Sequence, residues 1–255
     1  MYEMIKVFVR FYEELNDFIR ADWRKQQIER QLRHHTTTKD LIESFGVPHT
    51  EVDLILVNGV SANFAHRVAD GDLISVYPVF ESFDISEVTR LQERPLRDLR
   101  FIADCHLGRL AGKMRLFGFD VEYRKDIGDD ELAAAVLNDR RVLLSRDRRL
   151  LMRRIIDRGY LVRSQNPDEQ IAEVIKRFDL GRQLKPFTRC ARCNGILERV
   201  EKAAVLHLLE PKTKLYFEDF FQCQSCRQVY WQGSHLSAIK EFIKKFTDSS
   251  FPLCS

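Results

Sequence analysis

The chain has 255 residues, of which 44% are hydrophobic and 31% are charged. This is a globular composition with room for one large domain or two to three small ones. No apolar run approaches the roughly 20 residues that a transmembrane helix needs, which excludes such a helix. Acidic residues interrupt the apolar N-terminal stretch, so we expect no signal peptide, no membrane partner and a cytoplasmic location, where thiols stay reduced.

Charge is distributed unevenly along the chain. Residues 1–95 carry 11 basic and 16 acidic residues, residues 96–180 carry 18 and 15, and residues 181–255 carry 12 and 7. This asymmetry predicts separate modules and places any surface for a polyanion in the last two of them. Ordinary variation among solvated faces is the alternative explanation.

Residues 1–83 are expected to form an α+β domain. Alternating apolar residues predict a strand over 4–12, and the segment after Thr38 predicts a helix that ends at Gly46. Two further strands are expected around an Asn58-Gly59 turn and after Asp70-Gly71. The stretch 18–37 fits either a helix or a long hairpin.

Residues 84–96 are polar, end before the next apolar segment, and are predicted to be a linker. Residues 97–180 then alternate between strands and helices, which predicts an α/β domain with a parallel sheet and helices on its faces. The expected strands are 99–103, 120–124, 141–145 and 160–164, and the expected helices are 107–119, 129–140, 147–159 and 166–178.

The third segment, residues 186–247, contains two C-x-x-C pairs, Cys190/Cys193 and Cys223/Cys226, with 29 residues between them. Two such pairs can place four thiolates around one zinc ion, and four thiolates leave no open position for water. We therefore predict a structural zinc ribbon. A redox role for a single pair is the alternative. Residues 205–217 alternate like hairpin strands, and residues 236–246 predict a closing helix.

Basic and aromatic residues of the ribbon suggest contacts with nucleic acid, Arg192 among them. Tyr216, Phe217, Tyr230 and Trp231 could stack on bases, but they could equally form the core of the ribbon; we expect about half of them in the core.

Acidic residues follow the strands of the second segment, where ligands of open parallel sheets bind. They are Asp104, Asp126, Asp129, Asp130, Glu131, Asp147, Asp168 and Glu169. Carboxylates that gather at one place favour Mg²⁺ or Mn²⁺, and such ions support hydrolysis of phosphodiesters. Nearby basic residues would hold a polyanion: Arg109, Lys113, Arg115, Arg146, Arg148 and Arg149.

Each of these acids also has a simpler interpretation as a helix cap or a loop residue. Asp129 or Asp130 fits the start of one predicted helix and Asp147 the start of another. Asp104 could cap the helix that begins near Leu107. From spacing alone, both interpretations stay open.

Several motifs together resemble the Mut-seven C-terminal family, a PIN-like ribonuclease domain with an attached zinc ribbon. They are FIADCHLGRLA, LFGFDV, the DDEL acids, SRDRRLL, CARC and CQSC, and they cover about residues 97–246. The resemblance implies a PIN-like α/β/α fold with catalytic acids Asp104, Asp129, Asp130 and Asp147. Asp104, Asp130 and Asp147 would bind Mg²⁺ or Mn²⁺.

Residues 36–80 resemble ubiquitin-like β-grasp domains of the sulfur-carrier kind. Carriers end in Gly-Gly, whereas this strand continues as YPVFESFD, so the resemblance implies docking of a protein partner or positioning of RNA rather than sulfur transfer.

The sequence therefore predicts a β-grasp domain, a PIN-like nuclease domain and a zinc ribbon. The expected activity is divalent-metal-dependent hydrolysis of RNA, such as tRNA or rRNA, by a water nucleophile. The expected nucleic-acid-binding residues are Arg109, Lys113, Arg146, Arg148, Arg149 and Arg192. A non-catalytic RNA-binding module and a protein-docking adaptor are the alternatives.

Overall fold

The computed structural model describes residues 4–33, 35–78, 99–231 and 241–242. Two compact units divide the chain: the described part of 1–99 with 128–161, and 100–127 with the described part of 162–255. Within these described ranges, none of the helices has both the length and the apolar character that crossing a membrane requires. The predicted linker 84–96 lies outside the described residues, and the domain boundaries 1–83, 97–180 and 186–247 stay a prediction.

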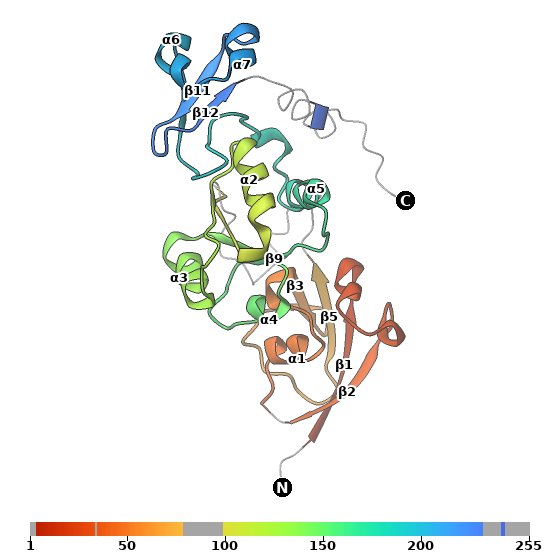
Figure 1. Cartoon of the computed structure of the whole chain (residues 1–255). Helices are drawn as coiled ribbons and strands as arrows, with labels where there is room; N and C mark the ends of the chain where they lie inside the picture. Colours follow the sequence, from red (N-terminus) through yellow and green to blue (C-terminus); the bar gives the residue numbers. More distant parts are fainter. Residues whose placement is uncertain (1–3, 34, 79–98, 232–240, 243–255) are drawn as a thin grey trace. The chain divides into compact units, whose positions relative to one another are not determined.

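The N-terminal segment folds around a mixed five-stranded sheet with the strand order β2-β1-β5-β3-β4 (Figure 1). Its strands are β1 (Met4–Phe11), β2 (Ile28–Arg33), β3 (Val52–Val57), β4 (Val60–Ala62) and β5 (Leu73–Pro78). β1 and β5 run parallel, whereas the other neighbouring strands are antiparallel. With helix α1 (Thr38–Ser44), this arrangement confirms the predicted β-grasp fold.

Local sequence explains most of this domain. The inward residues of β1, Ile5, Val7, Val9 and Phe11, are buried in alternation, as a half-buried strand requires. Asn58 and Gly59 both have positive φ, the conformation of the tight turn that joins two antiparallel strands.

The N-cap of helix α1 lies one residue earlier than predicted. Thr37, not Thr38, is the N-cap: its hydroxyl accepts a hydrogen bond from the Asp40 N–H, and the Asp40 carboxylate accepts one from the Thr37 N–H. Gly46 follows the helix with a φ of 83°, as predicted for its end.

The ambiguous stretch 18–37 contains strand β2, which pairs with β1 from Ile28 to Arg33. The connection holds the short 3-10 helices η1 (Glu13–Asp17) and η2 (Ala21–Trp23). Buried Asn16 fixes it: its amide donates to the Phe11 carbonyl at 3.0 Å, and its side-chain oxygen accepts from the Lys25 N–H at 2.7 Å.

Residues of the β-grasp segment bond to residues 156–161 within the first compact unit. The 3-10 helix η3 (His49–Glu51) supplies both contacts. The His49 imidazole lies 2.6 Å from the carbonyl oxygen of Ile156, and the Glu51 carboxylate accepts a hydrogen bond from the Leu161 N–H at 2.6 Å. Both side chains are buried, so water does not compete for these bonds.

The second predicted domain contains the expected alternation of strands and helices. Its strands β6 (Phe101–Ala103), β7 (Val121–Glu122), β8 (Val142–Ser145) and β9 (Gly159–Leu161) have the sheet order β7-β6-β8-β9. β6 and β7 pair in parallel, as do β8 and β9. The helices are η4 (Cys105–Leu107), α2 (Gly108–Leu116), α3 (Asp129–Asp139), α4 (Arg148–Leu151), α5 (Pro167–Arg177) and η5 (Gly181–Gln183).

The predicted helix 147–159 is much shorter than its apolar pattern indicates. α4 ends at Leu151, and Gly159 begins strand β9 instead of ending the helix. Glycine is required at this position of β9, because a Cβ on Gly159 would lie 2.5 Å from a methyl carbon of Leu151 and 3.2 Å from the Leu143 carbonyl oxygen. Only glycine lets the strand approach this closely.

The C-terminal ribbon is an antiparallel sheet with the order β10-β11-β12. Its strands are β10 (Leu197–Val200), β11 (Phe220–Cys223) and β12 (Val229–Trp231). The predicted hairpin over 205–217 is wrong: this segment contains the end of α6 (Lys202–Val205), followed by η6 (Leu206–Leu208) and α7 (Pro211–Tyr216). Val205 and Leu209, four residues apart, are buried against Phe220 and Val229, and Pro211 suits the first turn of α7.

The predicted closing helix 236–246 lies mostly outside the described residues. Within it, Glu241 and Phe242 are described and helical.

Candidate metal centre and acidic residues

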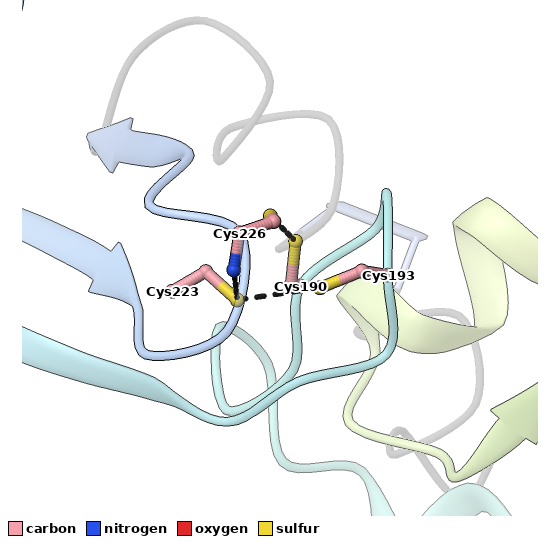
Figure 2. Close-up of side chains that lie close together, drawn as sticks. All are labelled: Cys190, Cys193, Cys223 and Cys226. Carbon is pink, nitrogen blue, oxygen red and sulfur yellow. Dashed lines mark hydrogen bonds between the residues drawn. The ribbon is translucent and has the colours of Figure 1, made fainter.

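The four cysteines of the two C-x-x-C pairs converge on one point (Figure 2). Their Sγ atoms all lie within 4.8 Å of one another, with Cys190 and Cys226 3.5 Å apart and Cys193 and Cys223 3.4 Å apart. Four sulfurs placed tetrahedrally at about 2.3 Å from a zinc ion are about 3.8 Å apart. The donor set and its spacing therefore fit a metal such as zinc.

Tight turns and one strand pair bring these thiols together. In the first turn, the Cys190 N–H donates to the Gly195 carbonyl and the Asn194 N–H to the Cys190 carbonyl, at 2.8 and 2.9 Å. A Cβ on Gly195 would lie 2.9 Å from the Cys223 sulfur, so the turn needs glycine. Pairing of Leu197 with Cys223 joins the two turns through β10 and β11.

The thiols differ in their readiness to lose a proton. Burial raises the pKa of Cys190, but hydrogen bonds from the Tyr230 hydroxyl and from backbone N–H groups outweigh it and lower the pKa to about 7. Burial, supported by hydrogen bonds with neighbouring thiols, raises the pKa of Cys193 to about 12 and that of Cys226 in the same direction. Thiolates this close repel one another, so full ionisation requires a cation among them.

Two of the four ribbon aromatics pack as core residues, as expected. Phe217 packs against the Val205 cluster, and the Tyr230 hydroxyl lies 3.1 Å from the Cys190 sulfur. Tyr216 and Trp231 are exposed, at 75% and 37%. Tyr216 and Trp231 therefore remain available for contacts with a ligand.

Arg115 is placed differently from its predicted role. Its side chain is only 4% exposed, so it cannot hold a polyanion at the surface. Its Nε donates to the Val121 carbonyl, and its Nη1 donates to the carbonyls of Ala191 and Arg192, between the first two cysteines. Sequence analysis missed this contact because no local pattern links residues 76 positions apart.

Asp104 follows strand β6 and is buried, with 4% of its surface exposed. Its carboxylate caps η4 by accepting a hydrogen bond from the His106 N–H at 2.8 Å. Asp104 therefore has the capping role that its position in the sequence allows, and the predicted role as a cation ligand would be additional to it.

Asp129 and Asp130 lie in the first turn of α3, where the helix dipole favours acids. Both contact Arg153, whose guanidinium nitrogens lie 2.6 Å from an Asp130 oxygen and 3.7 Å from an Asp129 oxygen. The hydrogen bond that Arg153 donates to Asp130 raises the pKa of Arg153. Glu131 is engaged in the cap, since its carboxylate accepts from the Gly128 N–H at 3.2 Å.

Asp147 is exposed and caps α4. Its carboxylate accepts hydrogen bonds from the N–H groups of Arg149 and Leu150 at 2.8 and 3.4 Å, and its own N–H donates to the Ser145 hydroxyl at 2.9 Å. Capping oxygens retain lone pairs, so the cap leaves part of the carboxylate available to a cation.

Among the described residues, the four cysteines are the one group in which three or more potential metal-binding side chains lie within 4.8 Å of one another. The acids are not part of such a group. The assignment of Asp104, Asp129, Asp130 and Asp147 as a catalytic set, with cations at Asp104, Asp130 and Asp147, stays a prediction.

Of the predicted RNA-binding residues, Lys113 is partly buried and the others are exposed: Arg109, Arg146, Arg148, Arg149 and Arg192. Lys113 forms an ion pair with Asp168, and the guanidinium of Arg148 lies 5.0 Å from the centre of the Phe18 ring. Lys113 and Arg148 would have to exchange these contacts for phosphate.

Comparison with known protein families gives a match for each of two parts of the chain. The sequence model described as the Mut7-C RNAse domain matches residues 99–243, and the one described as Mut7-C ubiquitin matches residues 4–84. No curated protein matches the chain. These matches agree with the two folds described above.

Proposed function

This chain belongs to the Mut7-C RNAse domain family, and we propose on that basis that it hydrolyses RNA phosphodiester bonds with the help of a divalent cation. Asp104, Asp129, Asp130 and Asp147 would be its acidic set. The family match carries this proposal, and the positions of the acids along the fold support it.

The topology of the parallel sheet supports Asp104 and Asp147 most directly. Each of these two acids follows the carboxyl end of a strand. Ligands of open α/β sheets bind beyond the carboxyl ends of the strands. Asp104 comes directly after β6, and Asp147 lies two residues after the end of β8.

The acids would act as cation ligands rather than as covalent catalysts. Carboxylate oxygens are the ligands that Mg²⁺ and Mn²⁺ prefer. Such a cation, when bound, would lower the pKa of a water and stabilise charge on the phosphodiester. Arg153, which contacts Asp129 and Asp130, would hold both carboxylates in place until a cation binds them or a phosphate binds Arg153.

The exposed arginines Arg109, Arg146, Arg149 and Arg192 would contact RNA phosphates. Lys113 and Arg148 belong to the proposed set as well, but each would first have to give up its present contact, with Asp168 and with Phe18. Exposed Tyr216, next to Lys212 and Lys214 on α7, offers a ring on which a base could stack. A tRNA or rRNA is the proposed substrate class.

The cysteine cluster would hold a structural zinc ion, because four thiolates leave no position for a substrate. Four reduced thiols also favour the cytoplasm as the place of action. The β-grasp domain would dock a protein partner or position RNA.

The direct experiment incubates the purified full chain with labelled tRNA, a structured rRNA fragment and an unstructured RNA. Each substrate is tested with Mg²⁺, Mn²⁺ or Ca²⁺ and without added metal, and zinc content is measured in every sample. Because EDTA would also remove zinc from the cysteines, omission and re-addition of Mg²⁺ or Mn²⁺ is the sharper control. Cleavage that needs Mg²⁺ or Mn²⁺ at constant zinc content is expected.

Salt-sensitive RNA binding without cleavage of any substrate would instead favour the non-catalytic RNA-binding module. Weak RNA affinity at physiological salt, with a protein bound to the β-grasp domain, would favour the adaptor.

A further inference from the structure

A buried positive charge lies next to the cysteine cluster. Arg115 is the penultimate residue of α2, and its side chain is 4% exposed. Burying a guanidinium is costly unless its hydrogen bonds are made and an opposite charge is nearby. The surroundings of Arg115 provide both.

The hydrogen bonds of Arg115 go to backbone carbonyls at three places. Nε donates to Val121 at 2.9 Å, and Nη1 donates to Ala191 at 3.1 Å and to Arg192 at 3.0 Å. Ala191 and Arg192 are the two residues between Cys190 and Cys193. The guanidinium therefore holds the backbone that spaces the first two thiols.

These three acceptors are uncharged, so they do not neutralise Arg115. Asp120 is the nearby carboxylate that influences it, but Asp120 is already bound by Arg189 at 3.2 Å and by the Asn194 amide at 2.9 Å. Burial lowers the pKa of Arg115, and ionised Cys193 and Cys190, followed by Asp120, would oppose that shift. The guanidinium also binds the backbone between these two cysteines, so it lies where their thiolates would need a counter-charge.

A divalent cation with four thiolates carries a net charge of −2, which is unfavourable in a partly buried site. A permanently protonated guanidinium beside the cluster reduces this cost. We propose that Arg115 is the internal counter-charge of the metal–thiolate cluster and sets its affinity for zinc. This inference depends on metal binding by the cysteines and is independent of RNA cleavage.

The alternative role of Arg115 is purely one of packing and hydrogen bonding. Two further bonds already join the same elements, because the Lys185 N–H donates to the Phe117 carbonyl and the Phe187 N–H to the Leu116 carbonyl. The end of α2 would therefore stay attached to the segment before Cys190 when the charge of Arg115 is removed. Charge and hydrogen bonding can be separated by substitution.

The test measures zinc affinity of the full chain by competition with a chromophoric chelator, and repeats it with Co²⁺, whose thiolate absorption reports on the cluster itself. Arg115→Gln removes the charge but retains an amide donor, whereas Arg115→Lys retains the charge. Arg109→Gln, on the exposed face of the same helix, is the matched control for one lost charge. Circular dichroism checks that each variant is folded.

We expect Arg115→Gln to weaken zinc binding about 10- to 100-fold, the usual effect of losing a group that supports metal ligands. Arg115→Lys should lose less than about tenfold and Arg109→Gln less than about twofold. Equal losses in the Gln and Lys variants, or parent-like affinity in a folded Gln variant, would overturn the counter-charge role. If the Gln variant does not fold, a loss above about tenfold in the Lys variant overturns it.

Discussion

The carboxylate of Glu51 accepts a hydrogen bond of 2.6 Å from the backbone N–H of Leu161, although the two residues are 110 positions apart. Glu51 is only 2% exposed and belongs to the segment that matches the Mut7-C ubiquitin description, whereas Leu161 ends strand β9 of the RNAse domain. β9 is an edge strand, and unpaired N–H groups of such strands need a partner. The β-grasp segment therefore supplies the hydrogen-bond acceptor for the last N–H group of this strand.

Glu51→Ala should destabilise the protein by about 1–3 kcal/mol, because it leaves a buried N–H without this acceptor. For a chain of this size, that is a fall of roughly 2–12 °C in Tm. Thermal unfolding followed by circular dichroism measures it. The exposed Asp17→Ala serves as the control, and equal Tm values for both variants would contradict a structural role of the Glu51 bond.

Gly159→Ala and Gly112→Ala should have opposite effects. A Cβ at Gly159 meets Leu151 at 2.5 Å, so alanine there should cost about 1–3 kcal/mol through overpacking. Gly112 lies within α2, where the nearest atom to a new Cβ is 3.8 Å away, and alanine should stabilise the helix by about 0.5–1 kcal/mol. Urea unfolding of both variants measures the two differences, and a destabilised Gly112→Ala would contradict the described packing of α2.

Removal of the metal should unfold the ribbon and loosen the end of α2. Structural zinc sites contribute on the order of 10 kcal/mol to the folding of small modules, more than the small clusters around Val205 and Cys190 can replace. Hydrogen exchange should speed up in β10 to β12 and also at Lys185 and Phe187, whose N–H groups bond to the α2 end. Unchanged exchange after complete zinc removal would show that the cluster does not support the fold.

Cys193→Ser should lower the zinc content below one ion per chain, whereas Cys105→Ser should leave it unchanged. Cys193 is one of the four converging thiols, and Cys105 is an exposed thiol outside that group. Elemental analysis of both purified variants decides between them. Loss of zinc from Cys105→Ser as well would mean that metal is held elsewhere.

Sequence patterns predicted what local chemistry determines. The two C-x-x-C pairs, the Asn58-Gly59 turn and the alternating β1 strand are recognisable because each needs only neighbouring residues. The resemblance to the Mut-seven C-terminal family likewise depends on local motifs and is confirmed by the family match.

Tertiary contacts determined the features that the sequence could not predict. Helices α6 and α7 replace the expected hairpin because Val205 and Leu209 pack on Phe220, which follows later in the chain. Arg115 lies on the same face of α2 as buried Ala111 and Met114, and its partners Ala191 and Arg192 come from far along the chain. Arg153 carries no local signal for its contacts with Asp129 and Asp130.

The most direct test of the proposed ribonuclease compares single-turnover RNA cleavage by the parent and Asp104→Asn with Mn²⁺ at equal zinc content. Asparagine retains an oxygen that can cap η4, so the comparison isolates the negative charge. Asp157→Asn, an exposed acid paired with its neighbour Arg158, is the control. We predict a loss of about a hundredfold or more in Asp104→Asn alone, the size expected for a group that stabilises transition-state charge. Parent-like cleavage by a folded Asp104→Asn variant would contradict the assignment of Asp104 to the catalytic site.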